Sequence, residues 1–364
     1  MKVLFATNSA YLPQHVGGSE SSTHDLCLTL RDCGVEVGVL SGLLPWRPIE
    51  AKYPAQMSLR WGGCILRDDT QGYPVFRARE PALAVPELVR DQRPTIAVIQ
   101  AGRPLTLAGR FTALGVPTIV YLRDAFFDKL GGAVRDHPDV RYAATSRDLT
   151  RRFAEAFGIV PVRIPPLVRP ERYRVESLRK NVTFVCPFPM KGVEIALQLA
   201  RRRPAIPFVF VESWQLHPVQ RLLLRWRARS AGNITLRSPT LDMRSVYRDT
   251  KIILVPSLCF EAWGRVVSEA QASGIPALAS NRGGLPESVG EGGILVDPDA
   301  GIEAWQSALS RMWDDPAEYE RLAARGRQHA LRSEFQLSTI MSQLLALFSE
   351  MVARREGRRG VCGG

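Results

Sequence analysis

Two glutamates and a glycine stand close together in a segment whose residue types suit contacts with phosphate and hydroxyl groups. Residues 255–287 read VPSLCFEAWGRVVSEAQASGIPALASNRGGLPE. The apolar start predicts a buried strand; a loop then presents Glu261, and a helix that begins near Arg265 carries Glu269. The N–H groups of a helix start, together with Gly264, which permits close approach, suit a diphosphate. The carboxylates could accept hydrogen bonds from hydroxyl groups, Glu261 from a sugar and Glu269 from a ribose.

Each of these side chains also has a purely structural interpretation. Glu269 follows Arg265 by one helical turn, so the two could form an ion pair along the helix. Glu261 could be a solvated acid of the loop. The combination of two carboxylates, with seven residues between them, and a glycine between a strand and a helix favours a binding site over coincidence.

The segment resembles the Glu-x7-Glu signature of the retaining glycosyltransferases of family 4, which have the two-domain GT-B fold. The resemblance extends to the small-residue run at 270–276 and to the Gly-Gly-x-Pro-Glu that follows. In that family the first acid contacts the donor sugar and the second the ribose, which implies these roles for Glu261 and Glu269. The resemblance also implies that backbone groups between the two acids line the donor sugar and phosphates, namely those of Trp263, Gly264, Arg265 and Val266.

A lysine follows the first strand predicted for the second half of the chain, where residues 184–192 read FVCPFPMKG. At the start of a helix, Lys191 could meet phosphate oxygens as a point charge, and Gly192 would keep the helix start open. The alternative is an ordinary surface lysine. The family commonly has an arginine five residues before this lysine, where this chain has Cys186. Arg265 is the candidate that could supply the missing phosphate cation.

A pair of glycines, Gly17 and Gly18, lies between the first predicted strand and the first helix, in the sequence PQHVGGS at 13–19. Consecutive glycines before a helix suit an anion, although a tight turn would need them equally. The Gly-x-Gly-x-x-Gly pattern of dinucleotide-binding folds is absent. The family has a Gly-Gly loop here that faces the donor diphosphate and the acceptor, which implies that role for both glycines, and the adjacent His15 could contact the acceptor.

Arg123 and Asp124 follow another predicted strand, at a place where many relatives carry a histidine. An arginine could hold a phosphate or sugar oxygen but could not act as a base, and a structural Arg–Asp pair is an equal alternative. No Asp-x-Asp pair stands at a strand end. The sequence therefore predicts catalysis without a metal, with cationic side chains and helix starts stabilising the departing diphosphate.

Short apolar runs alternate with helical patterns along the chain, and this alternation occurs twice. Such runs are typical of parallel strands buried on both faces. The expected strands are Lys2–Thr7, Val35–Leu40, Thr95–Ile99, Thr118–Leu122, Tyr142–Thr145, Val182–Val185, Phe208–Val211, Ile252–Val255, Ala277–Ala279 and Ile294–Val296. The expected helices are Ser21–Cys33, Leu149–Phe157, Val193–Arg202, Val266–Ser273, Ile302–Trp313, Ala317–Leu331 and Leu337–Arg354. The predicted fold is α/β, with two doubly wound Rossmann-like domains facing each other across a cleft.

Prolines and charges between 161 and 180 mark the boundary between the two domains. We expect an acceptor-side domain at 1–170, a nucleotide-sugar-binding domain at 171–336, and a helix with a basic tail at 337–364 that could pack back on the first domain. Residues 45–79 mix glycine, proline and tryptophan with strand-like pieces and suggest a hairpin insertion. Ligands of such domains bind at the carboxyl ends of the strands.

The chain of 364 residues carries a net charge of +12, and its six cysteines include no Cys-x-x-Cys pair. A reduced, cytoplasmic protein fits this cysteine usage, without a signal peptide or a membrane-spanning run. The basic runs at 141–180, 201–203 and 221–229 leave four interpretations open: nucleic acid, peripheral contact with an anionic membrane surface such as the inner membrane face, a phosphorylated substrate, or a solvated face. Nucleic acid is disfavoured because aromatic residues are not interleaved with these runs.

Together these features predict a retaining glycosyltransferase that moves a sugar from a nucleotide diphosphate-sugar to a glycan, a lipid-linked or a small-molecule acceptor. No cofactor is expected beyond the donor. The catalytic candidates are Glu261, Lys191 and Arg265. A nucleotide-sugar epimerase or a phosphorylase on the same fold is the alternative enzyme. The alternative from another class is a non-catalytic basic module that binds membrane or nucleic acid.

Overall fold

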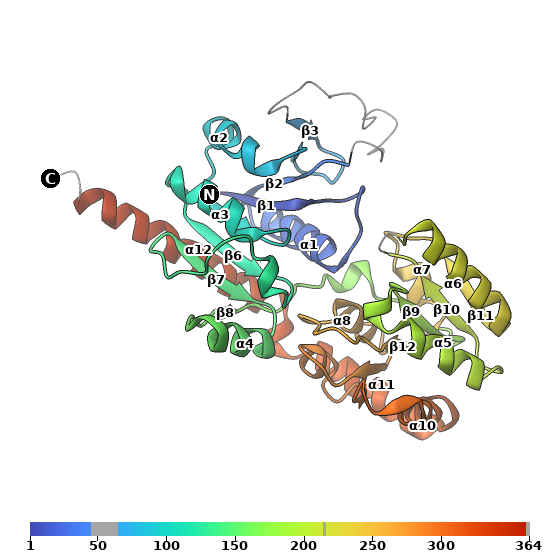
Figure 1. Ribbon diagram of the computed structural model, residues 1–364. Helices are drawn as coiled ribbons and strands as arrows, with labels where there is room; N and C mark the ends of the chain where they lie inside the picture. Colours follow the sequence, from blue (N-terminus) through green and yellow to red (C-terminus); the bar gives the residue numbers. More distant parts are fainter. Residues whose placement is uncertain (45–64, 214–215, 362–364) are drawn as a thin grey trace. The chain divides into compact units, whose positions relative to one another are not determined.

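The computed structural model describes residues 1–44, 65–213 and 216–361 and divides into two α/β units. The first unit comprises Met1–His15, Ser19–Leu167 and Leu337–Gly364, and the second comprises Val16–Gly18 and Val168–Gln336. The division at Leu167 lies beside the boundary that the sequence placed after residue 170. Figure 1 shows a sheet with helices on both sides in each unit.

The first unit is built on a sheet of eight strands in the order β3-β4-β2-β1-β5-β6-β7-β8. All neighbouring strands are parallel except β3 and β4. The strands are β1 (Lys2–Ala10), β2 (Glu36–Gly42), β3 (Leu66–Asp68), β4 (Val75–Ala78), β5 (Ile96–Ile99), β6 (Thr118–Leu122), β7 (Val140–Ala144) and β8 (Val162–Arg163). The helices are α1 (Gly18–Asp32), α2 (Pro81–Gln92), α3 (Pro104–Ala113), α4 (Arg147–Phe157) and α12 (Leu337–Val361).

The second unit is built on a parallel sheet of six strands in the order β11-β10-β9-β12-β13-β14. The strands are β9 (Asn181–Val185), β10 (Phe208–Val211), β11 (Ile234–Arg237), β12 (Thr250–Val255), β13 (Ala277–Ser280) and β14 (Gly293–Val296). The helices are α5 (Val193–Arg202), α6 (Pro218–Ala231), α7 (Arg244–Tyr247), α8 (Arg265–Gln271), α9 (Leu285–Val289), α10 (Gly301–Asp314) and α11 (Pro316–Ala330). Every strand expected from the sequence is present in the two sheets, so the predicted pair of doubly wound Rossmann-like domains is confirmed.

The sheet of the second unit is buried on both faces because alternate residues of one strand point to opposite sides. In β12, Ile252 and Leu254 belong to one apolar cluster, whereas Ile253 and Val255 belong to another. The first cluster includes Trp305 of α10, and the second is closed by side chains of α8 and α9. This two-sided burial explains why the strands read as continuous apolar runs in the sequence.

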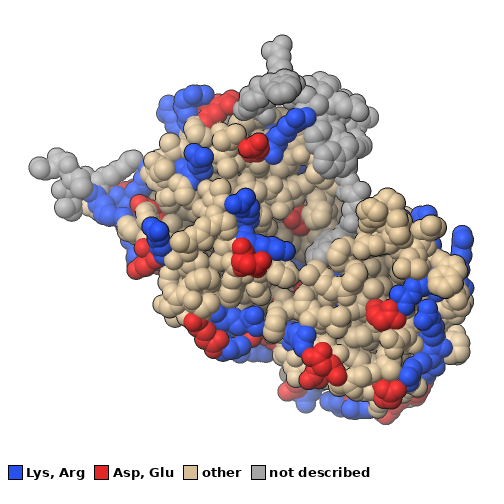
Figure 2. All heavy atoms as spheres, viewed as in Figure 1, with Lys and Arg blue, Asp and Glu red and all other residues tan. Residues whose placement is uncertain are grey.

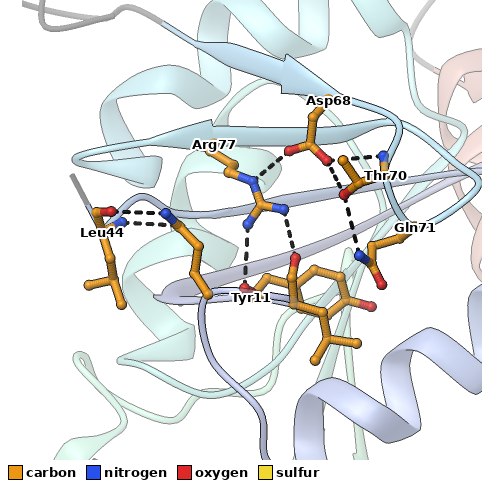
Figure 3. A network of polar contacts seen from close by, with 8 residues as sticks. Tyr11, Leu44, Asp68, Thr70, Gln71 and Arg77 are labelled. Atoms are coloured by element: carbon orange, nitrogen blue, oxygen red, sulfur yellow. Dashed lines mark hydrogen bonds and ion pairs between the residues drawn. The ribbon is translucent and has the colours of Figure 1, made fainter. Parts of the chain in front are cut away.

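A buried ion pair joins the two strands of a β-hairpin at the edge of the first sheet, and its arginine also contacts the rest of the unit. The hairpin strands β3 and β4 are antiparallel, as the sequence suggested for this insertion, and residues 45–64 of the same prediction lie outside the described residues. Arg77 Nε donates to Asp68 Oδ2 at 2.6 Å, and both side chains are completely buried (Figure 3). Arg77 Nη2 also donates to the carbonyl oxygen of Leu12 at 2.6 Å, beyond the end of β1. The acid at 68 is therefore a structural partner of Arg77.

The long helix α12 belongs to the first unit, although it follows the whole second unit in sequence. Its buried side chains include Leu344, Phe348 and Met351. Arg358 Nη2 donates to Asp139 Oδ1 at 2.6 Å, which ties the end of the helix to the loop before β7. Within the described ranges, no helix combines the length and the apolarity needed to cross a bilayer.

We predict that Asp68→Ala lowers the free energy of unfolding of the first unit by about 3–5 kcal/mol, because it leaves the buried guanidinium of Arg77 without its carboxylate. Urea denaturation followed by circular dichroism measures this change. The matched control is Asp69→Ala, which removes a neighbouring carboxylate whose side chain is 53% exposed. Equal, small losses in the two variants would contradict the anchoring role of the Asp68–Arg77 pair.

Candidate functional site

The candidate site of the second unit lies at the point where the order of strands in its sheet reverses. Strands β9 and β12 are neighbours, and from them the chain adds strands outward on opposite sides. The chain leaves these two strands toward opposite ends of the sheet, and the carboxyl edge at this switch point is the usual place for a ligand in an open α/β sheet. The loop after β9 contains the short 3-10 helix η3 (Pro189–Lys191), and the loop after β12 leads into α8.

The two loops touch through their backbones. The amides of Leu258 and Cys259 both donate to the carbonyl oxygen of Met190, at 3.0 and 3.2 Å. Gly192 has a φ of +80°, and a Cβ atom at this position would lie 1.9 Å from the carbonyl oxygen of Pro256. Both the conformation and the contact require glycine, since any side chain would force the loops apart.

This contact brings together Lys191 and Glu261, two of the residues singled out in the sequence. Lys191 Nζ lies 2.6 Å from Glu261 Oε1, and the same oxygen accepts a hydrogen bond from Ser257 Oγ at 2.6 Å. Both charged side chains are mostly buried, with 17% of Lys191 and 15% of Glu261 exposed. Glu261 Oε2 accepts no hydrogen bond from the described residues, so one carboxylate oxygen remains available to a ligand.

The charge of Lys191 is stabilised by its surroundings. Burial lowers the pKa of the ammonium group, but the Glu261 carboxylate, assisted by the neighbouring cysteines, raises it by more. The pKa of Lys191 therefore lies above its ordinary value, and the side chain stays protonated at neutral pH. A fixed positive charge at this edge of the sheet suits an anionic ligand such as a diphosphate.

Two further glycines support the backbone of Glu261 from the opposite side. The amide of Gly284 donates to the carbonyl oxygen of Glu261 at 2.7 Å. A Cβ atom on Gly283 would lie 2.4 Å from that same oxygen, and one on Gly284 would lie 2.4 Å from the carbonyl oxygen of Ala262. The Gly-Gly-x-Pro-Glu run, noted in the sequence only as part of the resemblance, thus holds the acid in place.

Arg265 and Glu269 form a second, separate cluster on α8. Arg265 Nε donates to Glu269 Oε1 at 2.6 Å, and Tyr247 Oη donates to Glu269 Oε2 at 2.7 Å. Arg265 Nη2 also donates to Tyr173 Oη at 2.6 Å. Only 5% of the Arg265 side chain and 6% of the Glu269 side chain are exposed. The helix ion pair considered as the alternative in the sequence is therefore present, reinforced by two tyrosines.

The buried cluster also affects the ionisation of Tyr247. Burial raises the pKa of this phenol well above its usual value, and the neighbouring Glu269 carboxylate raises it further. Tyr247 therefore remains a hydrogen-bond donor to Glu269 over the accessible pH range.

The other residues that the sequence assigned to donor binding are Trp263, Gly264 and Val266. The indole of Trp263 is buried, donates to Ser268 Oγ at 2.9 Å, and meets the ring of Phe335 edge-on. Gly264 is left-handed with a φ of +87° and caps the start of α8, where Val266 lies in the first turn. Cys186, at the position of the family arginine, is buried and also left-handed, with a φ of +65°.

Gly17 and Gly18 end the loop between β1 and α1, and Gly18 is the first residue of that helix. Arg123 follows β6 and donates to Ser22 Oγ at 2.7 Å and to Gln100 Oε1 at 3.1 Å. Its guanidinium also stacks on the ring of Tyr121, 4.0 Å from the ring centre.

A pocket of about 480 Å³ opens beside Arg123 at the carboxyl ends of β5 and β6. Arg103, Arg123, Asp124 and Lys129 lie on its wall. Burial raises the pKa of the Asp124 carboxyl, which accepts a hydrogen bond from the amide of Phe126 at 3.0 Å. His15, the acceptor-side candidate, lies near the buried Glu20, whose carboxyl has its pKa raised by burial and lowered in part by His15.

Several residues of these clusters escaped the sequence analysis. Ser257 could have been predicted, because a hydroxyl residue directly after a buried strand lies at the carboxyl edge of the sheet, where ligands bind. Tyr173 and Tyr247 could not, since they reach Arg265 and Glu269 from distant parts of the chain. No group of three or more His, Cys, Asp or Glu side chains that could hold a metal ion occurs among the described residues.

Comparison with known proteins connects this site to one family. Residues 187–329 match the model of the family described as "Glycosyl transferases group 1", and this range contains Lys191, Glu261, Arg265 and Glu269. The D-inositol 3-phosphate glycosyltransferase of Corynebacterium glutamicum is 38% identical over 117 residues, which cover 32% of this chain and 27% of that protein. An exopolysaccharide phosphotransferase of Streptomyces coelicolor is 26% identical over 366 residues, covering 96% of this chain and 36% of that protein. The chain thus spans about a third or less of the length of these curated relatives.

The fold matches solved structures over nearly the whole chain. The crystal structure of the Anabaena protein HepE in complex with UDP-glucose superimposes with a TM-score of 0.76, at 17% identity, and covers 96% of this chain and 100% of that chain. WaaG, a glycosyltransferase involved in lipopolysaccharide biosynthesis, superimposes with a TM-score of 0.69, at 14% identity, over 94% of this chain and 98% of that chain. The two Rossmann-like units are those of the GT-B architecture.

The buried position of Arg265 changes what its removal should do. We predict that Arg265→Ala lowers the free energy of unfolding by about 3–5 kcal/mol, because it leaves Glu269 buried without its cation. It should also weaken binding of a nucleoside and of its diphosphate by the same factor, since Glu269 loses its fixed position. Isothermal titration calorimetry with the nucleoside and with its diphosphate measures the two dissociation constants. Arg321→Ala, which removes an arginine of the same unit whose side chain is 55% exposed, is the control and should change neither property. A loss confined to the diphosphate would instead make Arg265 the second phosphate cation.

Proposed function

We propose that this protein is a retaining glycosyltransferase that transfers a sugar from a nucleotide diphosphate-sugar to an acceptor hydroxyl. The observation that carries the proposal is the Lys191–Glu261 pair at the switch point of the second sheet. The pair lies within the segment that matches the glycosyl transferases group 1 family. The relation to a D-inositol 3-phosphate glycosyltransferase and the fold shared with HepE, solved with UDP-glucose, support the same class.

The chemistry of the transfer explains why a cation and a carboxylate should stand together. The bond between the sugar C1 and the diphosphate oxygen breaks, and the departing diphosphate gains negative charge. Lys191 is protonated and mostly buried, so it can stabilise this charge without solvent reorganisation. Glu261 holds Lys191 through Oε1 and would offer Oε2 to a sugar hydroxyl of the donor.

The remaining residues would position the donor and the acceptor. Glu269, kept in place by Arg265 and Tyr247, would accept a hydrogen bond from the ribose. The backbone of residues 263–266 would line the sugar and phosphates. On the acceptor side, the pocket beside Arg123 and Asp124 would receive the acceptor, with Gly17 and Gly18 at the loop between β1 and α1.

We further propose that the reaction retains the anomeric configuration and needs no metal ion. Retention rests on the resemblance to family 4, and we favour front-face displacement, in which the leaving phosphate takes the proton of the acceptor hydroxyl. Lys191 would supply the positive charge at the diphosphate that a divalent cation supplies in other transferases. Proton NMR of the anomeric signal of the product tests retention directly.

Glu261→Gln tests the catalytic assignment. A contact to the reacting sugar strengthens in the transition state, so we predict that kcat falls by about tenfold to a hundredfold while the KM for the donor changes little. Glu269→Gln should mainly raise that KM, because a ribose contact is made equally in both states. Steady-state kinetics with the true donor and acceptor measures both.

The matched control for these kinetics is Glu291→Gln, which changes a carboxylate of the same unit whose side chain is 73% exposed. It should behave like the wild type. Circular dichroism and thermal melting must show that all three variants are folded. Near wild-type turnover in folded Glu261→Gln would remove Glu261 from the catalytic site.

The nucleotide released from the donor distinguishes the possible reactions. We predict release of a nucleoside diphosphate that depends on the acceptor and persists in EDTA. A phosphotransferase, the activity named for the Streptomyces relative, would instead release a nucleoside monophosphate from a sugar nucleotide. An epimerase would convert the donor without an acceptor, and a phosphorylase would require inorganic phosphate. Chromatography of the nucleotides resolves these products.

Loss of turnover in EDTA, restored by Mg²⁺ or Mn²⁺, would refute only the metal-free part of the proposal.

A further inference from the structure

Helix α6 of the second unit turns its apolar side away from the protein. Only two of its side chains, Leu224 and Ala228, are buried, at 5% and 3% exposure. Four large apolar side chains of the same helix are exposed instead: Val219 at 66%, Leu222 at 69%, Leu223 at 52% and Trp226 at 64%. These four residues are called the α6 stripe below.

The spacing of the α6 stripe places its members on one side of the helix. Their positions follow the i, i+3, i+4, i+7 pattern, which covers about 100° of a helix surface. Leu224 and Ala228 lie on the opposite side and pack on the core of the unit. Single exposed leucines are common on protein surfaces, but four large apolar side chains in one continuous stripe mark an interaction surface.

The residues around the stripe are basic, and α6 contains four arginines and no acid. Arg221 and Arg227 form ion pairs with Glu212 and Glu194, which lie outside the helix. Arg225 and Arg229 are exposed, and neither forms an ion pair with a described residue. Figure 2 shows Lys and Arg side chains bordering uncharged surface along the edge of the second unit, where α6 lies in Figure 1.

Helix α4, which lies within the basic run at 141–180, lacks this combination. In α4, Arg151 pairs with both Asp148 and Glu155, so part of the positive charge is neutralised. None of the described side chains of α4 is a large exposed apolar residue. Basic charge and an exposed apolar stripe therefore coincide on α6 and not on α4.

From this coincidence we infer that α6 docks the protein on an anionic lipid bilayer. The α6 stripe enters the boundary between headgroups and acyl chains, and Arg225 and Arg229 contact lipid phosphates. With 14 residues, α6 is too short to span a bilayer and lies in the plane of the interface. Trp226 in the stripe suits this depth, because tryptophan prefers the membrane interface.

Charge distinguishes a bilayer from a second copy of this chain. If two copies met through their α6 stripes, a symmetric contact would bring the arginines of both helices together with no acid on either. Anionic headgroups would instead neutralise them. The inference rests on α6 alone and holds whether or not the proposed transferase activity is correct.

Flotation with lipid vesicles tests the inference on the full chain. We expect binding to vesicles of phosphatidylglycerol mixed with phosphatidylcholine, little binding to pure phosphatidylcholine, and weakening with added salt. Arg225→Gln combined with Arg229→Gln should lower the partition coefficient about 30-fold. Leu222→Gln combined with Trp226→Gln should lower it about tenfold or more, because the apolar contact is lost.

The controls change the same residue types elsewhere on the second unit. Leu241→Gln with Leu331→Gln removes two other exposed leucines, and Arg201→Gln with Arg244→Gln removes two other exposed arginines. Both pairs should bind vesicles like the wild type, and thermal melting should show every variant folded. No vesicle binding at low salt, or equal losses in the α6 and control variants, would overturn the inference. Self-association that Leu222→Gln with Trp226→Gln abolishes would assign the stripe to a second copy and overturn it as well.

Discussion

The candidate site of the second unit depends on how closely two loops approach each other at the centre of a parallel sheet. A Cβ atom on Gly192 would lie 1.9 Å from the carbonyl oxygen of Pro256, so the backbones are in direct contact. Because Lys191 precedes this glycine and Glu261 lies in the facing loop, the backbone contact fixes the distance between their charges. Gly283 and Gly284 support the other side of Glu261 in the same way. The geometry of the ion pair is therefore set by positions without side chains.

The two glutamates of one short motif occupy very different environments. Glu261 shares one oxygen with Lys191 and Ser257 and keeps the other available, whereas both oxygens of Glu269 accept hydrogen bonds from neighbouring side chains. A carboxylate with an available oxygen can rearrange when a ligand arrives. A carboxylate held at both oxygens has a fixed orientation, which Glu269 owes to Arg265 and Tyr247.

The fold could be predicted from the sequence because strands buried on both faces leave continuous apolar runs, such as residues 252–255. The position of Lys191 beside Glu261 could also be anticipated, since both follow strands of one sheet. The tyrosines around Glu269 could not, because contacts between distant segments leave no local pattern. The sequence also did not show which side of α6 faces the solvent. Leu222, Leu223 and Leu224 are identical in type, and only the packed structure shows that the third is buried and the other two exposed.

The place of α12 in the first unit has a consequence for the order in which the protein forms. The ribosome makes most of the first unit, then nearly all of the second unit, and only afterwards the helix whose residues Leu344, Phe348 and Met351 are buried in the first unit. The second unit can therefore complete its core during synthesis, whereas the first must wait with an apolar surface uncovered. The core of the first unit is therefore completed only after most of the second unit has been synthesised, and until then the surface that α12 covers is exposed to other apolar chains.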